Sequence, residues 1–217
     1  MSDNTLQYIS GKGWLIFSGG NRAGSPTRAK ALTRASGFGT TVYISLADDG
    51  GDALMDDMED LGGRTGYFID LLYDQPETIK EEMEAATMVV IEVGSSIDAL
   101  YNALQGAPLA TILAAYQRGA VILIEGLAVN LFGRWVVSDS GDLLDGFDWV
   151  KNTFIEPEST SATESRAVQA VLNQIDDAMA VNIGVGSALV LGQSQVEVWG
   201  DEVTISLGRT YAADQDE

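Results

Sequence analysis

Short apolar runs alternate with longer amphipathic segments from Trp14 to Ile124, and this alternation constrains the fold more than any other feature of the chain. Runs of this kind are typical of strands that are buried on both faces of a parallel sheet. The segments between them have the length and spacing of helices that cover such a sheet. The expected strands are 14–18, 41–46, 66–72, 88–93 and 121–124, and the expected helices are 26–36, 52–61, 77–86, 96–104 and 109–117.

The pattern changes after Gly133. One helix is expected at 165–174, and strands follow at 188–191, 196–199 and 203–207. Because Gly200-Asp201 is a typical two-residue turn, we expect the last two strands to form a hairpin. The sequence therefore predicts an α/β fold with a mostly parallel central sheet and an antiparallel C-terminal extension.

The chain of 217 residues fits one α/β domain better than two small ones. No Gly/Ser-rich linker, single-charge run or fixed-period repeat divides the sequence, so one domain over 1–217 is expected. Residues 1–10 are mostly polar and residues 212–217 are acidic. Both ends are expected to be held loosely.

The charge balance limits the partners that the protein can bind. Thirty-two acidic residues oppose twelve basic ones, so the formal net charge is −20, which repels nucleic acids and anionic membranes. Many acids and few lysines are typical of proteins from a salt-rich cytoplasm, where salt screens the repulsion between like charges. The alternative interpretation is an ordinary soluble protein with a solvated acidic surface. No N-terminal signal pattern and no apolar window of about 18 residues is present, which predicts a soluble, cytoplasmic protein.

The sequence contains no histidine and no cysteine. Disulfides, thiolate nucleophiles and sulfur-bound zinc are therefore excluded, and the commonest transition-metal ligand is missing. Seven acids between Asp48 and Asp60 invite comparison with a calcium-binding loop, but Ala53 stands where that loop requires glycine. Acids at the start of a helix interact favourably with the helix dipole, which explains this cluster without a bound calcium ion. We therefore expect no metal site, and no other motif predicts a cofactor.

Four segments, in their order along the chain, resemble the cyanophycinase and aspartyl-dipeptidase group of serine peptidases, family S51. GWLIFSGGN (13–21) is similar to the opening strand and Gly-Gly turn of the family, and MVVIEVGSSIDAL (88–100) to its FFTGGDQ segment. LATILAAYQRGAVILIEGLAVNLFG (109–133) is similar to the segment with the G-x-S-A-G nucleophile elbow, and IGVGSALVLGQSQVEVWGDEVTI (183–205) to the C-terminal ending. The resemblance implies a flavodoxin-like three-layer fold, close to class I glutamine amidotransferases, and a homodimer.

The residues that carry catalysis in that family do not recur here. The nucleophile position falls at Gly126, after Glu125, or at Leu127 if the alignment shifts by one residue, and neither side chain can act as a nucleophile. Glu158 stands at the position of the histidine. Because the chain has no histidine, a Ser-His pair is impossible under any alignment. The resemblance therefore implies no catalytic residue and a vestigial site or ligand cleft that consists of Gly94, Ser95, Ser96, Glu125, Gly126, Leu127 and Glu158.

Several of these positions have two interpretations. Gly94 either lets backbone N–H groups approach a bound oxygen or simply forms a turn. Ser95 and Ser96 either cap the next helix, the favoured interpretation, or bind a ligand. Leu131, Phe132, Trp135, Phe147 and Trp149 are expected mainly in the core, with a self-association face at the two tryptophans as the alternative.

Three functions are compatible with the sequence. The leading hypothesis is a catalytically inactive protein that acts by binding or self-assembly. The second is a hydrolase that uses Ser95 or Ser96 as nucleophile, with a nearby carboxylate or with Lys12 or Lys151 as base. The third is a binder of basic amino acids or dipeptides, in which Gly126 leaves room for the ligand and Glu125 or Glu158 contacts its positive charge.

Overall fold

Buried apolar runs form a seven-stranded central sheet in the computed structural model, which describes residues 6–20, 26–35, 37, 39–47, 51–163 and 165–208. Its parallel strands are β1 (Trp14–Ser18), β2 (Thr40–Ser45), β3 (Tyr67–Phe68), β4 (Ala86–Glu92) and β5 (Val121–Glu125). Two antiparallel strands, β10 (Ala188–Gly192) and β11 (Gln195–Trp199), continue the sheet beyond β1. The strand order is β11-β10-β1-β5-β4-β2-β3.

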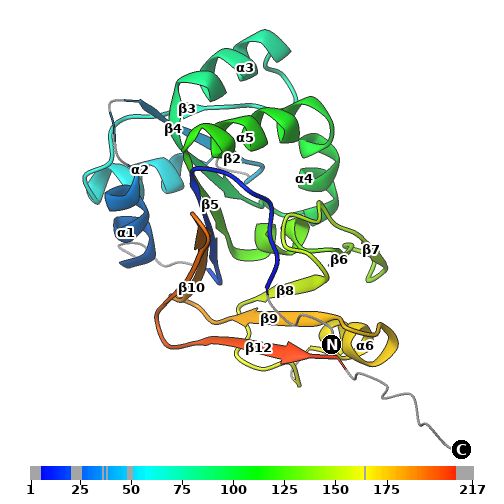
Figure 1. Cartoon of the computed structure of the whole chain (residues 1–217). Helices are drawn as coiled ribbons and strands as arrows, with labels where there is room; N and C mark the ends of the chain where they lie inside the picture. The colour runs from blue at the N-terminus through cyan, green and yellow to red at the C-terminus, as the bar shows by residue number, and fades with distance from the viewer. Residues whose placement is uncertain are drawn as a thin grey trace, which may run out of the picture.

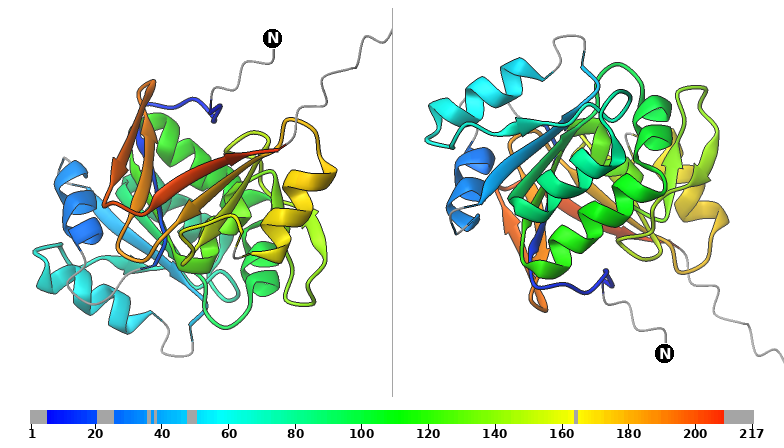
Figure 2. Two further views of the ribbon diagram at one scale, coloured as in Figure 1. Left: turned by 90° about the horizontal axis from the view of Figure 1, so that it is seen from below. Right: turned by 90° about the horizontal axis from the view of Figure 1, so that it is seen from above.

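Helices cover both faces of the central sheet because successive strand residues point to opposite sides. Leu15 and Phe17 pack into one apolar cluster with α3 (Pro76–Ala85), α4 (Ile97–Leu104) and α5 (Ala107–Arg118). Ile16 packs into another cluster with α1 (Pro26–Arg34) and α2 (Asp52–Asp60). Figure 2 shows the two helix groups on opposite sides of the sheet. The predicted α/β class with a mostly parallel central sheet is confirmed.

A second sheet, which the sequence patterns did not predict, adjoins the first. It contains β6 (Trp135–Val137), β7 (Leu143–Asp145), β8 (Thr153–Pro157), β9 (Met179–Ile183) and β12 (Val203–Leu207), in the order β12-β9-β8-β6-β7 (Figure 1). Ile155 and Val181 pack toward the central sheet, whereas Phe154 and Ala180 pack against α6 (Arg166–Gln174). β8 and β9 are therefore covered on both faces, but each contains a polar residue, Glu156 or Asn182, so neither has the continuous apolar run of a buried strand.

The predicted hairpin between the last two strands was wrong. β11 pairs with β10, and their turn is Gln193-Ser194, with φ of 50° and 61°. This is the geometry of a two-residue hairpin turn, but it lacks the glycine that usually signals one. After β11, the N–H of Gly184 donates to the carbonyl of Glu202 over 2.7 Å, and β12 pairs with β9 in the second sheet.

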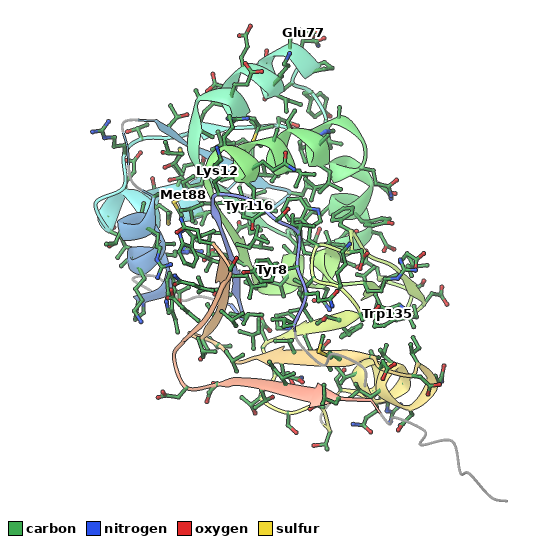
Figure 3. The ribbon with its side chains drawn as sticks, viewed as in Figure 1. Tyr8, Lys12, Glu77, Met88, Tyr116 and Trp135 are labelled. Atoms are coloured by element: carbon green, nitrogen blue, oxygen red, sulfur yellow. The ribbon has the colours of Figure 1, made fainter. Side chains whose placement is uncertain are left out.

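Two further predictions differ in extent from the structure. The strand expected at 66–72 is only Tyr67–Phe68, because the Asp70 carboxylate accepts hydrogen bonds from the N–H groups of Leu72 and Tyr73 and turns the chain. Residues 6–10, expected to be loose, are held by hydrogen bonds. The N–H of Ile9 donates to the carbonyl of Trp149, and the hydroxyl of Tyr116, labelled in Figure 3, donates to the carbonyl of Ile9. The acidic tail at 212–217 lies outside the described residues.

The large apolar residues between positions 131 and 149 serve mainly the core, as expected. Leu131, Phe132 and Trp149 are buried, and the Phe132 ring lies 4.9 Å from that of Trp149 and 5.5 Å from that of Phe147. Trp135 is half-buried against the α6 cluster. Because Trp149 is only 3% exposed, it is not part of a surface for self-association. In the described part of the chain, no helix has the length and apolar character needed to cross a membrane.

Candidate functional site

The carboxyl ends of four parallel strands meet at one edge of the central sheet. The strand register places Ser18 beside Glu125, Glu125 beside Glu92, and Glu92 beside Ser45. In open α/β sheets, ligands bind in the crevice outside this edge. The register therefore brings polar side chains from distant parts of the sequence to the place where a ligand is expected.

A cleft of about 290 Å³ lies at this edge, a size suited to a small molecule. Its lining contains three carboxylates and one guanidinium. Five of the seven residues that the sequence singled out line the cleft, although their function stays a prediction, whereas Ser95 and Ser96 do not belong to the lining. The lining residues are Gly20, Arg28, Glu92, Val93, Gly94, Glu125, Gly126, Leu127 and Glu158.

Gly126 has the backbone of a nucleophile elbow without a nucleophile. It follows β5, begins the 3₁₀ helix Gly126–Phe132 and has a φ of 57°. A nucleophile elbow is a sharp strand-to-helix turn of this kind, which exposes its side chain at the top of the sheet. A Cβ atom added to Gly126 would meet nothing within 4 Å, so any side chain there would project into open space.

A buried ionic cluster lies beneath this turn. Arg28, on α1, donates from Nη2 to Glu125 Oε2 over 2.6 Å, from Nε to the same oxygen over 3.0 Å, and from Nη1 to Asp57 Oδ2 over 2.7 Å. Arg28 and Asp57 are each 9% exposed and Glu125 is 4% exposed. The guanidinium therefore holds together α1, α2 and the end of β5.

Burial and pairing act in opposite directions on the charges of this cluster. Burial opposes the positive charge of Arg28, but hydrogen bonds and charges from Glu125 and Asp57 outweigh that effect and raise its pKa. Burial raises the pKa of Glu125, and hydrogen bonds from Arg28 oppose this rise. The short hydrogen bonds from Arg28 nevertheless pair the Glu125 carboxyl group inside the chain instead of leaving it open to a ligand.

Sequence reasoning missed Arg28, and a signal for it was present. Arg28 and Ala31 are three residues apart on the buried face of α1, where a basic side chain needs an acidic partner. Asp57 lies between Leu54 and Met58 on the buried face of α2, although the sequence suggested only a helix-dipole role for it. Neither signal identifies the partner, because α1 and α2 meet only in the folded chain.

Two other carboxylates complete the acidic lining. Glu92, at the end of β4, accepts a hydrogen bond from Ser45 Oγ over 2.9 Å. Glu158 follows β8 of the second sheet with a φ of 57°, and its N–H donates to the carbonyl of Gly19 over 3.1 Å. Its side chain reaches the Cα of Gly20, where an added Cβ would lie 3.3 Å from Glu158 Oε1. The structure thus brings Glu158, which the resemblance alone places at the histidine position, into the same cleft as Gly126.

The segment after β4 is fixed by packing and capping. A Cβ on Gly94 would collide with the carbonyl of Leu46, so glycine is required there for the close approach of two backbones. Ser96 caps α4: its Oγ accepts from the N–H of Ala99 over 3.0 Å and donates to the carboxylate of Asp139. The capping interpretation of Ser96 is therefore confirmed, while Ser95 is exposed.

The lysines considered as bases are placed elsewhere. Lys12, labelled in Figure 3, precedes β1 and so lies at the edge of the sheet opposite to Ser95, which follows β4. Lys151 Nζ donates to the carbonyl and the carboxylate of Asp148, each over 2.7 Å. Neither arrangement supports a Ser-Lys dyad.

The described residues contain no group of three acidic side chains arranged to hold a metal ion. Of the acids compared with a calcium loop, Asp48 and Asp49 lie outside the described residues. Asp57 pairs with Arg28.

Glu156, close to the cleft residue Glu158, gives a pH-dependent prediction. Burial raises its pKa, and hydrogen bonds from Ser165 and Asn130 oppose the rise. A raised pKa in the folded state means that stability is lost as pH rises through that pKa. We expect Glu156→Gln to raise the Tm by a few degrees at pH 7, because it removes the cost of burying a charge, and to have little effect near pH 4. Thermal unfolding of both proteins from pH 4 to pH 8 measures this difference, and a Tm gain that does not change with pH would contradict the assignment.

Comparisons with known proteins identify the fold. No protein-family model and no curated protein sequence matches the chain. The structure resembles a peptidase from an acI-B1 actinobacterium with a TM-score of 0.71 and 15% sequence identity, over 92% of this chain and 93% of the other. It also resembles a peptidase E-like protein from Listeria monocytogenes EGD-e with a TM-score of 0.64 and 12% identity, over 86% of this chain and 98% of the other. The chain therefore has the fold of these peptidases.

Proposed function

We propose that this protein is a catalytically inactive relative of the S51 serine peptidases, which binds a small, positively charged ligand in the cleft at the carboxyl end of its central sheet. One observation carries the proposal: the elbow turn has its backbone form, but its nucleophile position is Gly126, inside an acidic cleft. A ligand, instead of a reacting side chain, fits the space that this glycine leaves.

The chemistry of the lining supports the loss of catalysis. Acyl transfer by a serine peptidase needs a nucleophile and a base that accepts its proton. Gly126 supplies no nucleophile, and the sequence contains no histidine to act as the base. Ser96, one of the two alternative nucleophiles that the sequence offers, uses its hydroxyl to cap α4 and to bind Asp139.

The charge of the lining supports a cationic ligand. Glu92, Glu125 and Glu158 oppose one Arg28 in the cleft, and Arg28 is committed to Glu125 and to Asp57. Glu92 and Glu158 are the two carboxylates of the lining for which no contact with Arg28 is seen among the described residues. Carboxylates that line a concave, poorly hydrated surface attract cations more strongly than the same groups on an open surface.

The catalytic half of the proposal is tested with aspartyl dipeptides and cyanophycin-like isopeptides. We expect no hydrolysis above the rate without protein. Turnover that is lost in Ser95→Ala or Ser96→Ala would overturn the proposal in favour of a hydrolase with an altered nucleophile.

The binding half is tested by thermal unfolding with arginine, lysine and dipeptides that contain them. A ligand held only by the folded state at one hundred times its Kd adds about 2.7 kcal/mol of stability, which in a chain of this size raises the Tm by roughly 5–10 °C. Glu158→Gln is expected to reduce this shift. Glu81→Gln removes the same charge from the exposed side of α3 and is expected to preserve it. No Tm shift with any cationic ligand, or an equal loss in both variants, would contradict binding in this cleft.

A further inference from the structure

Glu125 and Asp57 surround the guanidinium of Arg28 in the manner of a binding site. Arg28 Nη2 donates to Glu125 Oε2 and Nε donates to both Glu125 oxygens, at 3.2 Å to Oε1 and 3.0 Å to Oε2, which is the forked contact that suits a planar guanidinium. Asp57 accepts from Nη1. The carboxylates come from α2 and from the end of β5, while the guanidinium comes from α1. Three separate segments of the chain thus build one guanidinium-shaped contact.

This contact lies at the cleft itself. Arg28 and Glu125 both line the cleft, and the Arg28 side chain is 11% exposed. Shortening Arg28 would therefore join the space of its side chain to the cleft. The exposed face of that new space would be Glu125 and Asp57, two carboxylates with their guanidinium removed.

We propose that Glu125 and Asp57 form a guanidinium site at the floor of the cleft, and that Arg28 occupies this site as a ligand supplied by the chain itself. Arg28 then determines which cations the cleft accepts. In the native protein Arg28 already occupies Glu125, so the guanidinium of a ligand cannot form the forked contact there. Such a ligand is held by Glu92 and Glu158 instead. This selectivity rests on the proposed function, whereas the site itself does not.

The competition favours Arg28 strongly. A side chain attached to the same fold acts at a high effective concentration, so a free guanidinium does not displace it at ordinary concentrations. The cleft of the native protein is therefore closed to guanidinium at its floor. Removing the Arg28 side chain should open that floor to a small guanidinium compound.

The test compares methylguanidinium with methylammonium as probes of Arg28→Ala. Calorimetric titration is expected to show methylguanidinium binding to the variant roughly tenfold more tightly than methylammonium, the ratio that the second arm of a forked contact provides. Native protein is expected to show no such preference. Adding Glu125→Gln to Arg28→Ala should abolish the preference, because the charged forked acceptor is then lost.

Two results would overturn the proposal: equal affinity of Arg28→Ala for the two probes, or a preference that persists after Glu125→Gln. If Arg28→Ala does not fold alone, its refolding yield is measured in each probe. Recovery with methylguanidinium but not with methylammonium supports the site, and equal yields in both contradict it. If the native protein binds no cationic amino acid, the proposed function is refuted, but the result of this test is unaffected.

Discussion

Arg28→Ala is expected to lower the free energy of unfolding by about 3–5 kcal/mol, because it leaves two buried carboxylates without their cation. Glu125 is 4% exposed and Asp57 9% exposed, so water compensates them poorly. Urea unfolding of native and variant protein measures the difference. The effect should be less than additive with Glu125→Gln, since the second change removes one of the carboxylates that the first leaves unpaired.

Arg134→Ala is the matched control for this prediction. Arg134 also pairs with an aspartate, Asp145, over 3.2 Å, but the two side chains are 39% and 69% exposed. An exposed pair of this kind contributes about 0–1 kcal/mol. Equal costs for Arg28→Ala and Arg134→Ala would show that the buried cluster contributes no more than a surface ion pair.

Gly94→Ala is expected to cost about 3 kcal/mol, at the upper end of what overpacking causes. The added Cβ would collide with the carbonyl of Leu46, and a backbone atom has no alternative rotamer to relieve the contact. The turn after β4 must therefore move away from the chain that follows β2. Urea unfolding measures the loss of stability, and the moved turn should also weaken any ligand binding in the cleft.

Gly126→Ala provides the comparison within the same cleft. A Cβ at position 126 meets nothing within 4 Å, so the cost comes only from the φ of 57°, about 1–2 kcal/mol for a residue with a Cβ. The two glycines thus separate crowding from backbone conformation. A Gly126→Ala variant that is destabilised more than Gly94→Ala would contradict both assignments.

Much of the central sheet could be predicted because local pattern and burial agree there. The strand expected at 14–18 is β1, and the helix expected at 96–104 is α4 with Ser96 as its cap. The near-complete burial of β1 and β5 produces the continuous apolar runs from which they were predicted. The second sheet was missed because β8 and β9 each carry a polar residue, Glu156 and Asn182, that interrupts a short apolar run, so neither the continuous pattern of a buried strand nor the alternation of an exposed one is present.

Some sequence predictions stay predictions. A single domain, a homodimer, a cytoplasmic location and an acidic surface adapted to high salt all rest on composition or resemblance. Self-association remains an alternative way for the protein to act without catalysis.

The sequence by itself determined the α/β pattern, the absence of histidine and the glycine at the nucleophile position, because these are properties of residue type and local order. Tertiary structure decided which carboxylates share the cleft. Arg28 meets Glu125 across 97 positions of sequence and Asp57 across 29, and Glu158 arrives from a second sheet that no local pattern indicated. Such contacts depend on how distant segments pack. The residue type of a charged side chain does not identify the partner that will neutralise it.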